Sequence, residues 1–388
     1  MKKINKFDKK IYIYLILFIT FIIILLLIYL YKYNYNYNSN LFKNENFIAN
    51  WIPENNKSFS YYRCPEKELG LITKNIFQKN NINNSNDNWN IYIPCGYNNV
   101  EEELKKIVIK NNEPTNKKYI FGLNGCDSIV SKNKIWESLV SCFGREKASY
   151  LMPESYVLDN VIDMLEFEKQ FNNNSQDIYI LKKNVQRKEG LKLTTDFFEI
   201  NNAKKENYRV VQKYITNLYL INGYKVNLRI YVLIINNNGK IDFLISKLGK
   251  CIYTNKKYNH NDFDFETNIT SYNLDMNIYK ENPRDFKELY LYISEKSSVE
   301  NANLLFRNIN NLFSDLSICL KKNIFQSQNI NDTISFQLFG ADVIFDKNFH
   351  TYLLEMNKGP DMTSRDNIDE IMKTSVQSDM FKKVGIKR

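Results

Sequence analysis

Three residues near the C-terminus have the side-chain types and the spacing of a magnesium site. Asp342 lies in one apolar segment and Glu355 and Asn357 lie in the next, with a polar stretch around Lys347 and Asn348 between them. Alternating apolar residues on both sides of such a turn predict a β-hairpin. Side chains two apart in a strand share a face, so we expect Glu355 and Asn357 to point the same way, with Asp342 directly across from Glu355. Two carboxylates and an amide oxygen are hard ligands, which suit Mg²⁺ bound together with substrate phosphates.

The same alternation also fits a plain hairpin with a polar outer face, and the pattern alone leaves both interpretations open. Other chemistries have less support. The six cysteines form no CxxC pair, so a zinc site is not expected, and their even number permits disulfides without predicting any. His260 and His350 are the two histidines, too few for a histidine-rich metal centre, and a Ser-His-Asp hydrolase has no support.

Length and charge narrow the class of protein. The chain has 388 residues, 44% of them hydrophobic, which is enough for one large domain or two closely packed ones. A net charge of +10 favours acidic partners such as nucleotides, acidic protein tails or anionic lipid. The abundance of Asn, Lys, Ile and Tyr offers a purely compositional reason for that charge. No Lys/Arg block or recognition motif indicates a nucleic-acid partner.

The N-terminal segment predicts a membrane anchor. Residues 11–31 contain no charged side chain, and as a helix they would extend about 31 Å, enough to cross a lipid bilayer. Lysines are frequent in the basic segment 1–10, and the positive-inside rule then favours a cytosolic N-terminus. We therefore expect a single-pass membrane protein with an Asn/Tyr-rich tether at 32–60, and the face of the membrane that carries residues 61–388 stays open.

The segments that must position the hairpin alternate between strands and helices. Strand composition is found at 91–94, 119–122, 178–182, 208–214 and 228–234, and a helix is predicted at 101–110. A long amphipathic helix is predicted at 302–325, where apolar residues recur at helical spacing. This mixture of elements predicts an α+β fold.

Taken in order, these segments resemble the tubulin–tyrosine ligase-like family, a branch of the ATP-grasp enzymes. The matching motifs are Ser131-Lys132, Leu151–Leu158, Ile180–Lys182 with Gly190-Leu191, Val211–Ile215, Gly223–Val232, Thr267-Asn268, and Asp342 with Leu354–Asn357 and Pro360. Each motif is weak alone, but their joint order is specific, and the resemblance extends from about residue 120 to the C-terminus. It implies an ATP-grasp-like fold with the nucleotide between two α+β lobes. The N-terminal lobe would be 61–150, and the central and C-terminal ATP-grasp lobes would be 151–388.

The resemblance also implies roles for individual residues. Arg229 and Lys250 would be catalytic, and Mg²⁺ would be held by Asp342, Glu355 and Asn357. ATP would be held by Lys132, Lys182, Gly190, Gln212, Lys213, Tyr214, Ile215, Lys225, Asn227, Thr267 and Asn268. Lysines suit a triphosphate. Arg229 lies inside an apolar strand and needs an anionic partner, either a structural salt bridge or the transferred phosphate.

The implied reaction joins a free amino acid, Tyr, Glu or Gly, to a protein carboxylate through an acyl-phosphate. The default acceptor is the acidic tail of tubulin. The same ligase chemistry on a non-tubulin peptide stays open, since sequons occur at Asn56 and Asn331. A catalytically inactive nucleotide-binding membrane adaptor is a further alternative.

The chain departs from the family pattern at several positions. Asn227 stands where relatives have aspartate, Lys250 where they have arginine, and Phe265 where they have histidine. The loop 183–189 lacks the usual proline and first glycine, which leaves only Gly190 for close backbone approach. These departures leave the acceptor and the turnover open.

Overall fold

A computed structural model describes Thr20, Ile22 and residues 59–107, 117–173, 177–185, 190–259, 262–270, 274–327, 330 and 332–386. The chain divides into two compact units, Met1–Ile48 and Ala49–Arg388. The architecture below is that of the second unit. The predicted basic segment at 1–10 lies outside the described residues, and so does the predicted tether, apart from 59–60.

The membrane prediction needs correction. In the described part of the chain, no helix is both long and apolar enough to cross a membrane, so the predicted single-pass localisation is wrong on this finding. Helix α10 (Val299–Leu320), the longest of the described helices, is amphipathic, because Leu305 and Leu316 are buried while Arg307 and Asn311 are exposed. A membrane-spanning helix must instead be apolar on all sides. The segment predicted to span, 11–31, lies outside the described residues except for Thr20 and Ile22.

The larger sheet carries the predicted hairpin. Its strand order is β10-β9-β11-β4-β3-β1-β2, and β12 also pairs with β11. Four antiparallel strands form one part: β9 (Val226–Asn237), β10 (Lys240–Tyr253), β11 (Thr333–Phe345) and β12 (Thr351–Asn357). The rest is parallel: β1 (Ser60–Tyr62), β2 (Asn83–Asn84), β3 (Ile91–Tyr92) and β4 (Lys118–Phe121). The two long strands β9 and β11 are buried almost throughout, which explains their continuous apolar sequence.

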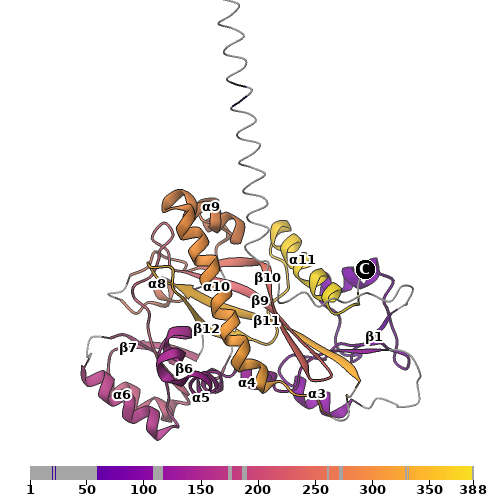
Figure 1. Ribbon diagram of the computed structural model, residues 1–388, viewed down its shortest axis with the longest axis horizontal. Helices are drawn as coiled ribbons and strands as arrows, with labels where there is room; N and C mark the ends of the chain where they lie inside the picture. The colour runs from indigo at the N-terminus through magenta and orange to yellow at the C-terminus, as the bar shows by residue number, and fades with distance from the viewer. Residues whose placement is uncertain are drawn as a thin grey trace, which may run out of the picture. The chain divides into compact units, whose positions relative to one another are not determined.

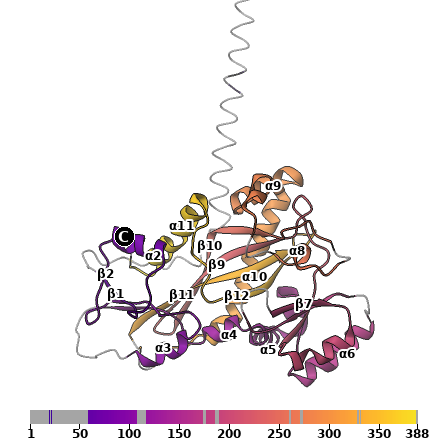
Figure 2. The same ribbon diagram turned by 180° about the vertical axis from the view of Figure 1, so that it is seen from behind.

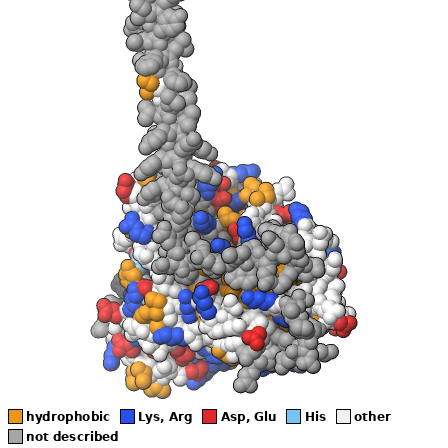
Figure 3. Space-filling model, turned by 45° about the vertical axis from the view of Figure 1, so that its right-hand side comes forward, with side chains coloured by type: hydrophobic (Ala, Val, Ile, Leu, Met, Phe, Trp, Pro, Cys, Tyr) orange, Lys and Arg blue, Asp and Glu red, His pale blue; other side chains and the backbone are white. Residues whose placement is uncertain are grey.

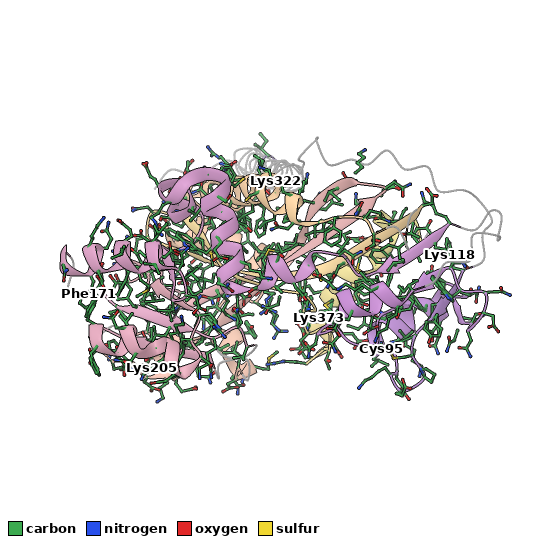
Figure 4. All side chains as sticks on the ribbon, turned by 90° about the horizontal axis from the view of Figure 1, so that it is seen from below. Cys95, Lys118, Phe171, Lys205, Lys322 and Lys373 are labelled. Carbon is green, nitrogen blue, oxygen red and sulfur yellow. A yellow bond between two sulfur atoms is a disulfide. The ribbon has the colours of Figure 1, made fainter. Side chains whose placement is uncertain are left out.

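A smaller antiparallel sheet has the order β5-β8-β6-β7. Its strands are β5 (Ser155–Val157), β6 (Tyr179–Lys182), β7 (Leu191–Thr194) and β8 (Val210–Lys213). Helices α6 (Val161–Asn173) and α7 (Phe197–Asn202) cover one face, where Phe167 and Ile200 pack on Tyr179 and Val211. Figure 4 labels Phe171 and Lys205 at this end of the unit and Cys95 and Lys118 at the opposite end.

Helices cover the larger sheet and set the positions of its strands. α10 packs against α9 (Phe286–Lys296), α5 (Lys132–Leu151) and β12 (Figure 1). α11 (Asn367–Lys383) packs against α2 (Leu71–Lys79) around a core that includes Phe77, Phe336 and Phe381 (Figure 2). The shorter helical elements are α3 (Val100–Lys106), α4 (Cys126–Val130), η3 (Ala203–Glu206), α8 (Phe265–Asn268), η4 (Met276–Lys280) and η5 (Lys321–Asn323).

The prediction of a mixed α+β fold is confirmed, and the predicted strands at 178–182 and 228–234 correspond to β6 and β9. The amphipathic helix predicted at 302–325 is α10, which starts three residues earlier and continues into η5. The sequence did not decide whether the cysteines form disulfides. In the structure, Cys64 and Cys95 form a disulfide next to the N-terminal strands of the larger sheet.

Candidate active site

Four charged residues lie in one row across four neighbouring strands. Lys250 on β10 pairs with Arg229 on β9, Arg229 pairs with Asp342 on β11, and Asp342 pairs with Glu355 on β12. Directly opposed residues of antiparallel strands share a face, so all four side chains leave the sheet on the same side. The predicted placement of Asp342 across from Glu355 is confirmed.

This row lines a cavity of about 490 Å³ whose walls come from both sheets. That volume falls within the ordinary range for small-ligand sites. Most of the residues implicated by the sequence line it: Lys182, Gln212, Lys213, Tyr214, Ile215, Lys225, Asn227, Arg229, Lys250, Asp342, Glu355 and Asn357. Lys132, Gly190, Thr267 and Asn268 lie outside the described cavity wall. Apolar side chains such as Ile180, Leu191 and Ile344 complete the wall.

The partner of Arg229 is Asp342. Arg229 Nε lies 2.5 Å from Asp342 Oδ1, and Arg229 Nη2 lies 3.1 Å from Asp342 Oδ2, a bidentate ion pair. Although burial works against the charged guanidinium, Asp342 raises the pKa of Arg229 above its usual range. The sequence left a salt bridge and a phosphate as alternatives, and in this structure the salt bridge satisfies the arginine.

Glu355 is held among cations. Lys132 Nζ lies 3.6 Å from Glu355 Oε2, and Asn357 Nδ2 donates to Glu355 Oε1 at 3.2 Å. Burial alone would raise the pKa of Glu355, but Lys132 and Lys182 outweigh it and lower that pKa. Lys132 therefore contacts the site from the start of α5, although it does not line the cavity. Its backbone and ammonium are fixed by Asn184 Oδ1 and the Val185 carbonyl at 3.1 Å each.

Two buried lysines have strongly shifted protonation equilibria. Burial lowers the pKa of Lys182 to about 8, with Glu355 partly opposing it. Burial also lowers the pKa of Lys225 to about 7, and the nearby Lys182 adds to the effect. Lys182 donates to the Leu354 carbonyl at 3.3 Å, and Lys225 donates to Tyr214 Oη at 2.9 Å. Within the described residues neither ammonium is in a salt bridge, so an anion entering the cavity would gain by contacting both.

The implicated residues outside the cavity wall support it instead. The Asn268 carbonyl accepts from Lys225 Nζ at 2.8 Å and from Tyr214 Oη at 3.1 Å. The Asn268 side chain donates to Thr267 Oγ1 at 2.9 Å and to the Asp262 carbonyl at 2.8 Å, which fixes the loop. Thr267 and Asn268 thus act on the cavity through Lys225 and Tyr214.

Gly190 closes the turn between β6 and β7. Lys183 N donates to the Gly190 carbonyl at 2.8 Å, and a Cβ on Gly190 would meet Val185 Cγ2 at 2.5 Å. The glycine is therefore needed for close packing of the turn.

Gln212 is turned into the small sheet. Its Nε2 donates to Ser155 Oγ at 2.8 Å and to the Pro153 carbonyl at 3.3 Å. Asn227 donates to Thr270 Oγ1 at 3.0 Å, while its buried Oδ1 has no hydrogen-bond partner in the described part of the protein. An unpaired buried acceptor in a cavity wall favours a ligand that donates a hydrogen bond there.

The ion pairs beside Lys250 have no clear signal in the sequence. Lys250 Nζ lies 3.0 Å from Asp369 Oδ1, and Lys373 Nζ lies 3.0 Å from Asp369 Oδ2. Lys373, labelled in Figure 4, lines the cavity, as do Arg365 and Tyr279. Burial works against the charged form of Asp369, but Lys250 and Lys373 lower its pKa. Asp369 and Lys373 are four apart on a helix, a spacing that in sequence reads as an ordinary solvated pair.

The carboxylates fit a divalent cation. Asp342, Glu355 and Asn357 line one cavity, and the two carboxylates lie half-buried next to each other on paired strands. Two adjacent carboxylates repel each other and need compensating positive charge, which Arg229 and Lys132 supply in this structure. Two carboxylates and an amide oxygen on one wall are the oxygen donors that Mg²⁺ takes alongside phosphates. Lys182 and Lys225 lie in the same cavity, where a triphosphate would contact them.

The positive net charge is not concentrated in one patch on the face that Figure 3 presents. On the described surface in that view, Lys and Arg side chains are interspersed with Asp and Glu. Positive charge is instead concentrated inside the cavity, where Lys182, Lys225, Arg229 and Lys250 meet.

Comparison with known proteins adds an independent line of support. Residues 83–388 match the model of the "Tubulin-tyrosine ligase family". A "Probable tubulin polyglutamylase" of Bos taurus is 28% identical over 180 residues, covering 45% of this chain and 38% of the relative. A "Tubulin monoglutamylase" of Mus musculus is 24% identical over 281 residues, covering 67% of this chain and 23% of the relative. A "Probable beta-tubulin polyglutamylase" of Tetrahymena thermophila is 24% identical over 283 residues, covering 66% of this chain and 23% of the relative. The chain therefore matches less than half the length of these relatives.

Proposed function

The chain belongs to the tubulin-tyrosine ligase family, and on that premise we propose that it is an ATP-dependent ligase that joins an amino acid to a protein carboxylate. The observation that carries the proposal is the row Lys250–Arg229–Asp342–Glu355 in one cavity with Lys182 and Lys225. Cations and carboxylates gathered in one cavity suit a reaction that moves a phosphoryl group between anionic substrates.

The nucleotide would lie over the small sheet. Lys182 and Lys225 would contact its phosphates, and the Val211–Ile215 segment would run along its base. Asn227 Oδ1, buried without a partner among the described residues, would accept a hydrogen bond from the bound substrate. Mg²⁺ held by Asp342, Glu355 and Asn357 would supply charge neutralisation at the phosphates.

The acceptor carboxylate attacks the γ-phosphate of ATP, giving an acyl-phosphate and ADP. The amine of the incoming amino acid then attacks the acyl carbon, an amide bond forms, and phosphate leaves. Arg229 would orient the transferred phosphoryl group through the part of its guanidinium that Asp342 does not engage. Lys250 would hold the acceptor carboxylate as a point charge, without the bidentate geometry of an arginine.

We propose glutamate as the amino acid and the acidic tail of tubulin as the acceptor. The matched relatives are named as tubulin polyglutamylases and monoglutamylases, which supports both choices. Arg365 and Lys373 also line the cavity, and their positive charge suits an acidic side chain better than a neutral one.

A ligation assay tests the proposal. The full chain is incubated with MgATP, tubulin, and either glutamate, glycine or tyrosine, and intact mass is measured on the tubulin subunits. We expect mass additions of whole glutamyl residues that require ATP. If no amino acid is added under any of the three conditions, the proposed activity is refuted for tubulin.

One observation favours a second acceptor. The Cys64–Cys95 disulfide is of a kind that persists mainly in oxidising compartments, whereas tubulin is cytosolic. The second candidate is therefore the same ligase chemistry on a non-tubulin acidic peptide. The sequons Asn56 and Asn331 lie outside the described residues. Running the assay with a poly-glutamate-tailed peptide in place of tubulin separates the two acceptors. An inactive nucleotide-binding adaptor would bind MgATP and modify neither.

A further inference from the structure

Two free cysteines meet where α5 packs against α10. Cys142 on α5 is half-buried, and Cys319 on α10 is buried. The two helices are in contact along this stretch. Cys319 Sγ also donates to the Ser138 carbonyl at 2.9 Å, one helical turn before Cys142. The two thiols therefore lie close together at the interface between α5 and α10.

A cation accompanies the pair. Lys322, labelled in Figure 4, follows α10 and donates from its Nζ to Cys142 Sγ at 3.6 Å. Asn323 Nδ2 donates to Ser138 Oγ at 3.2 Å, so the segment that carries Lys322 is anchored to α5. An adjacent ammonium stabilises the negative charge that develops on sulfur during nucleophilic attack. The other two free cysteines, Cys126 and Cys251, are buried.

We propose that Cys142 and Cys319 form a peroxide-sensitive thiol pair that is oxidised to a disulfide between α5 and α10. This proposal is independent of the ligase activity. The oxidant would be hydrogen peroxide, and the half-buried Cys142 would be the sulfur that it meets first. Cys319 is buried behind it, which leaves Cys319 as the resolving thiol.

The chemistry balances in two steps. The Cys142 sulfur attacks one peroxide oxygen, the O–O bond breaks, and water leaves, giving a sulfenic acid at Cys142. The Cys319 sulfur then attacks the Cys142 sulfur, the S–O bond breaks, and the Cys319 proton goes to the departing oxygen as water. Two thiols lose two electrons in total, and the peroxide is reduced to two waters.

Such a disulfide would connect two parts of the site. α5 begins at Lys132, whose ammonium lies 3.6 Å from Glu355, and α10 packs against β12, which carries Glu355. The disulfide would tie the two elements on either side of this contact together. Because it would cross-link positions far apart in the chain, it would also raise the thermal unfolding midpoint of the oxidised protein by a few degrees, on the order of 5 °C.

The test uses the full chain with its Cys64–Cys95 disulfide intact. The protein is treated with hydrogen peroxide, quenched with catalase and denatured. Free thiols are then counted, and a non-reducing peptide map is recorded. We expect the four free thiols to fall to two, with a cross-linked peptide that joins Cys142 to Cys319. Persistence of all four thiols, or a cross-link between another pair, would overturn the proposal.

Variants separate the roles of the two sulfurs. Cys142→Ser should lose no thiol to peroxide, whereas Cys126→Ser should still form the cross-link. Cys319→Ala should stop at a sulfenic acid on Cys142 that dimedone traps. Lys322→Met should slow the thiol loss several-fold, and an unchanged rate would refute the role given to Lys322.

Discussion

Nucleotide binding is expected to take up protons at mildly alkaline pH, because two cavity lysines are largely uncharged there. The pKa of Lys225 is about 7 and that of Lys182 is about 8. At pH 8 roughly nine-tenths of Lys225 and about half of Lys182 are therefore neutral. A bound triphosphate favours the charged form of both ammonium groups and raises both pKa values. Binding should then take up about 1.4 protons per nucleotide at pH 8 and only about 0.1 at pH 6.

Titration calorimetry measures this uptake directly. MgATP is titrated into the protein at pH 8 in Tris and in phosphate, whose ionisation enthalpies differ, and the difference in heat gives the number of protons. Lys225→Met should leave about 0.5 proton and Lys182→Met about 0.9 proton. Lys183→Met is the matched control, because Lys183 is adjacent to Lys182 but stacks on Tyr208 outside the cavity wall, and it should keep the full uptake.

Equal heats in the two buffers at pH 8 would refute the assignment of the two lysines to the nucleotide site. Binding with full proton uptake in the Lys225→Met variant would refute the share given to Lys225. Affinity should also weaken as the pH rises from 7 to 9, because the charged lysines that the phosphates need become scarcer.

The lowered pKa values of Lys182 and Lys225 predict that the ligand-free protein gains stability between pH 7 and 9, since both lysines bind fewer protons in the folded than in the unfolded state. The Lys182→Met/Lys225→Met double variant should flatten the rise of the thermal unfolding midpoint with pH, and an unchanged slope would contradict this prediction. Glu355→Gln should lower the ligation rate by about 100-fold or more, because it removes a carboxylate facing the phosphates, while Glu300→Gln on the exposed start of α10 should match the parent in the same assay. Asp369→Asn should lower the free energy of unfolding by about 3–5 kcal/mol, because Lys250 and Lys373 lose their buried partner. Urea titration measures this change, and Asp379→Asn, at an exposed position of the same helix, should leave the free energy of unfolding near that of the parent. Gly249→Ala should lower the free energy of unfolding by about 1–3 kcal/mol, because its Cβ would lie 2.1 Å from Phe286 Cζ and 2.7 Å from the Arg229 carbonyl oxygen. Gly96→Ala, whose Cβ would have no atom within 4 Å, is the control, and equal thermal unfolding midpoints of the two variants would refute the predicted clash.

The sequence by itself determined the features that depend on local periodicity. The alternation around residues 342–357 was enough to predict the hairpin and to put Glu355 and Asn357 on one face, because the side-chain period of a strand is two. The pairing of Asp342 with Glu355 also depends on a register shift between Asp342 and Val343, which the sequence does not mark. The 3.6-residue period was likewise enough for α10. The joint order of short motifs was enough to indicate the family, since the relative order of cavity-lining segments along the chain is itself a constraint.

Periodicity was not enough where side chains meet across the fold. An apolar strand containing Arg229 required an anion, but only the pairing of β9 with β11 decided that Asp342 is that anion. Lys250 faces Arg229 because of a register shift between Ile245 and Gly249 on β10, which the sequence does not mark.

Asp369, Lys373 and the thiol pair Cys142–Cys319 also lay beyond reach of the sequence. Lys250 on β10 meets Asp369 on α11, and α5 meets α10, only when the whole fold is assembled. A local pattern also led to a wrong prediction, because the hydropathy of residues 11–31 predicted a membrane-spanning helix and none of the described helices could span a membrane. Local sequence patterns indicate which backbone conformation has the lowest free energy for a segment. Which charges neutralise one another depends on distances between segments, and those are set only when the core closes and water is excluded.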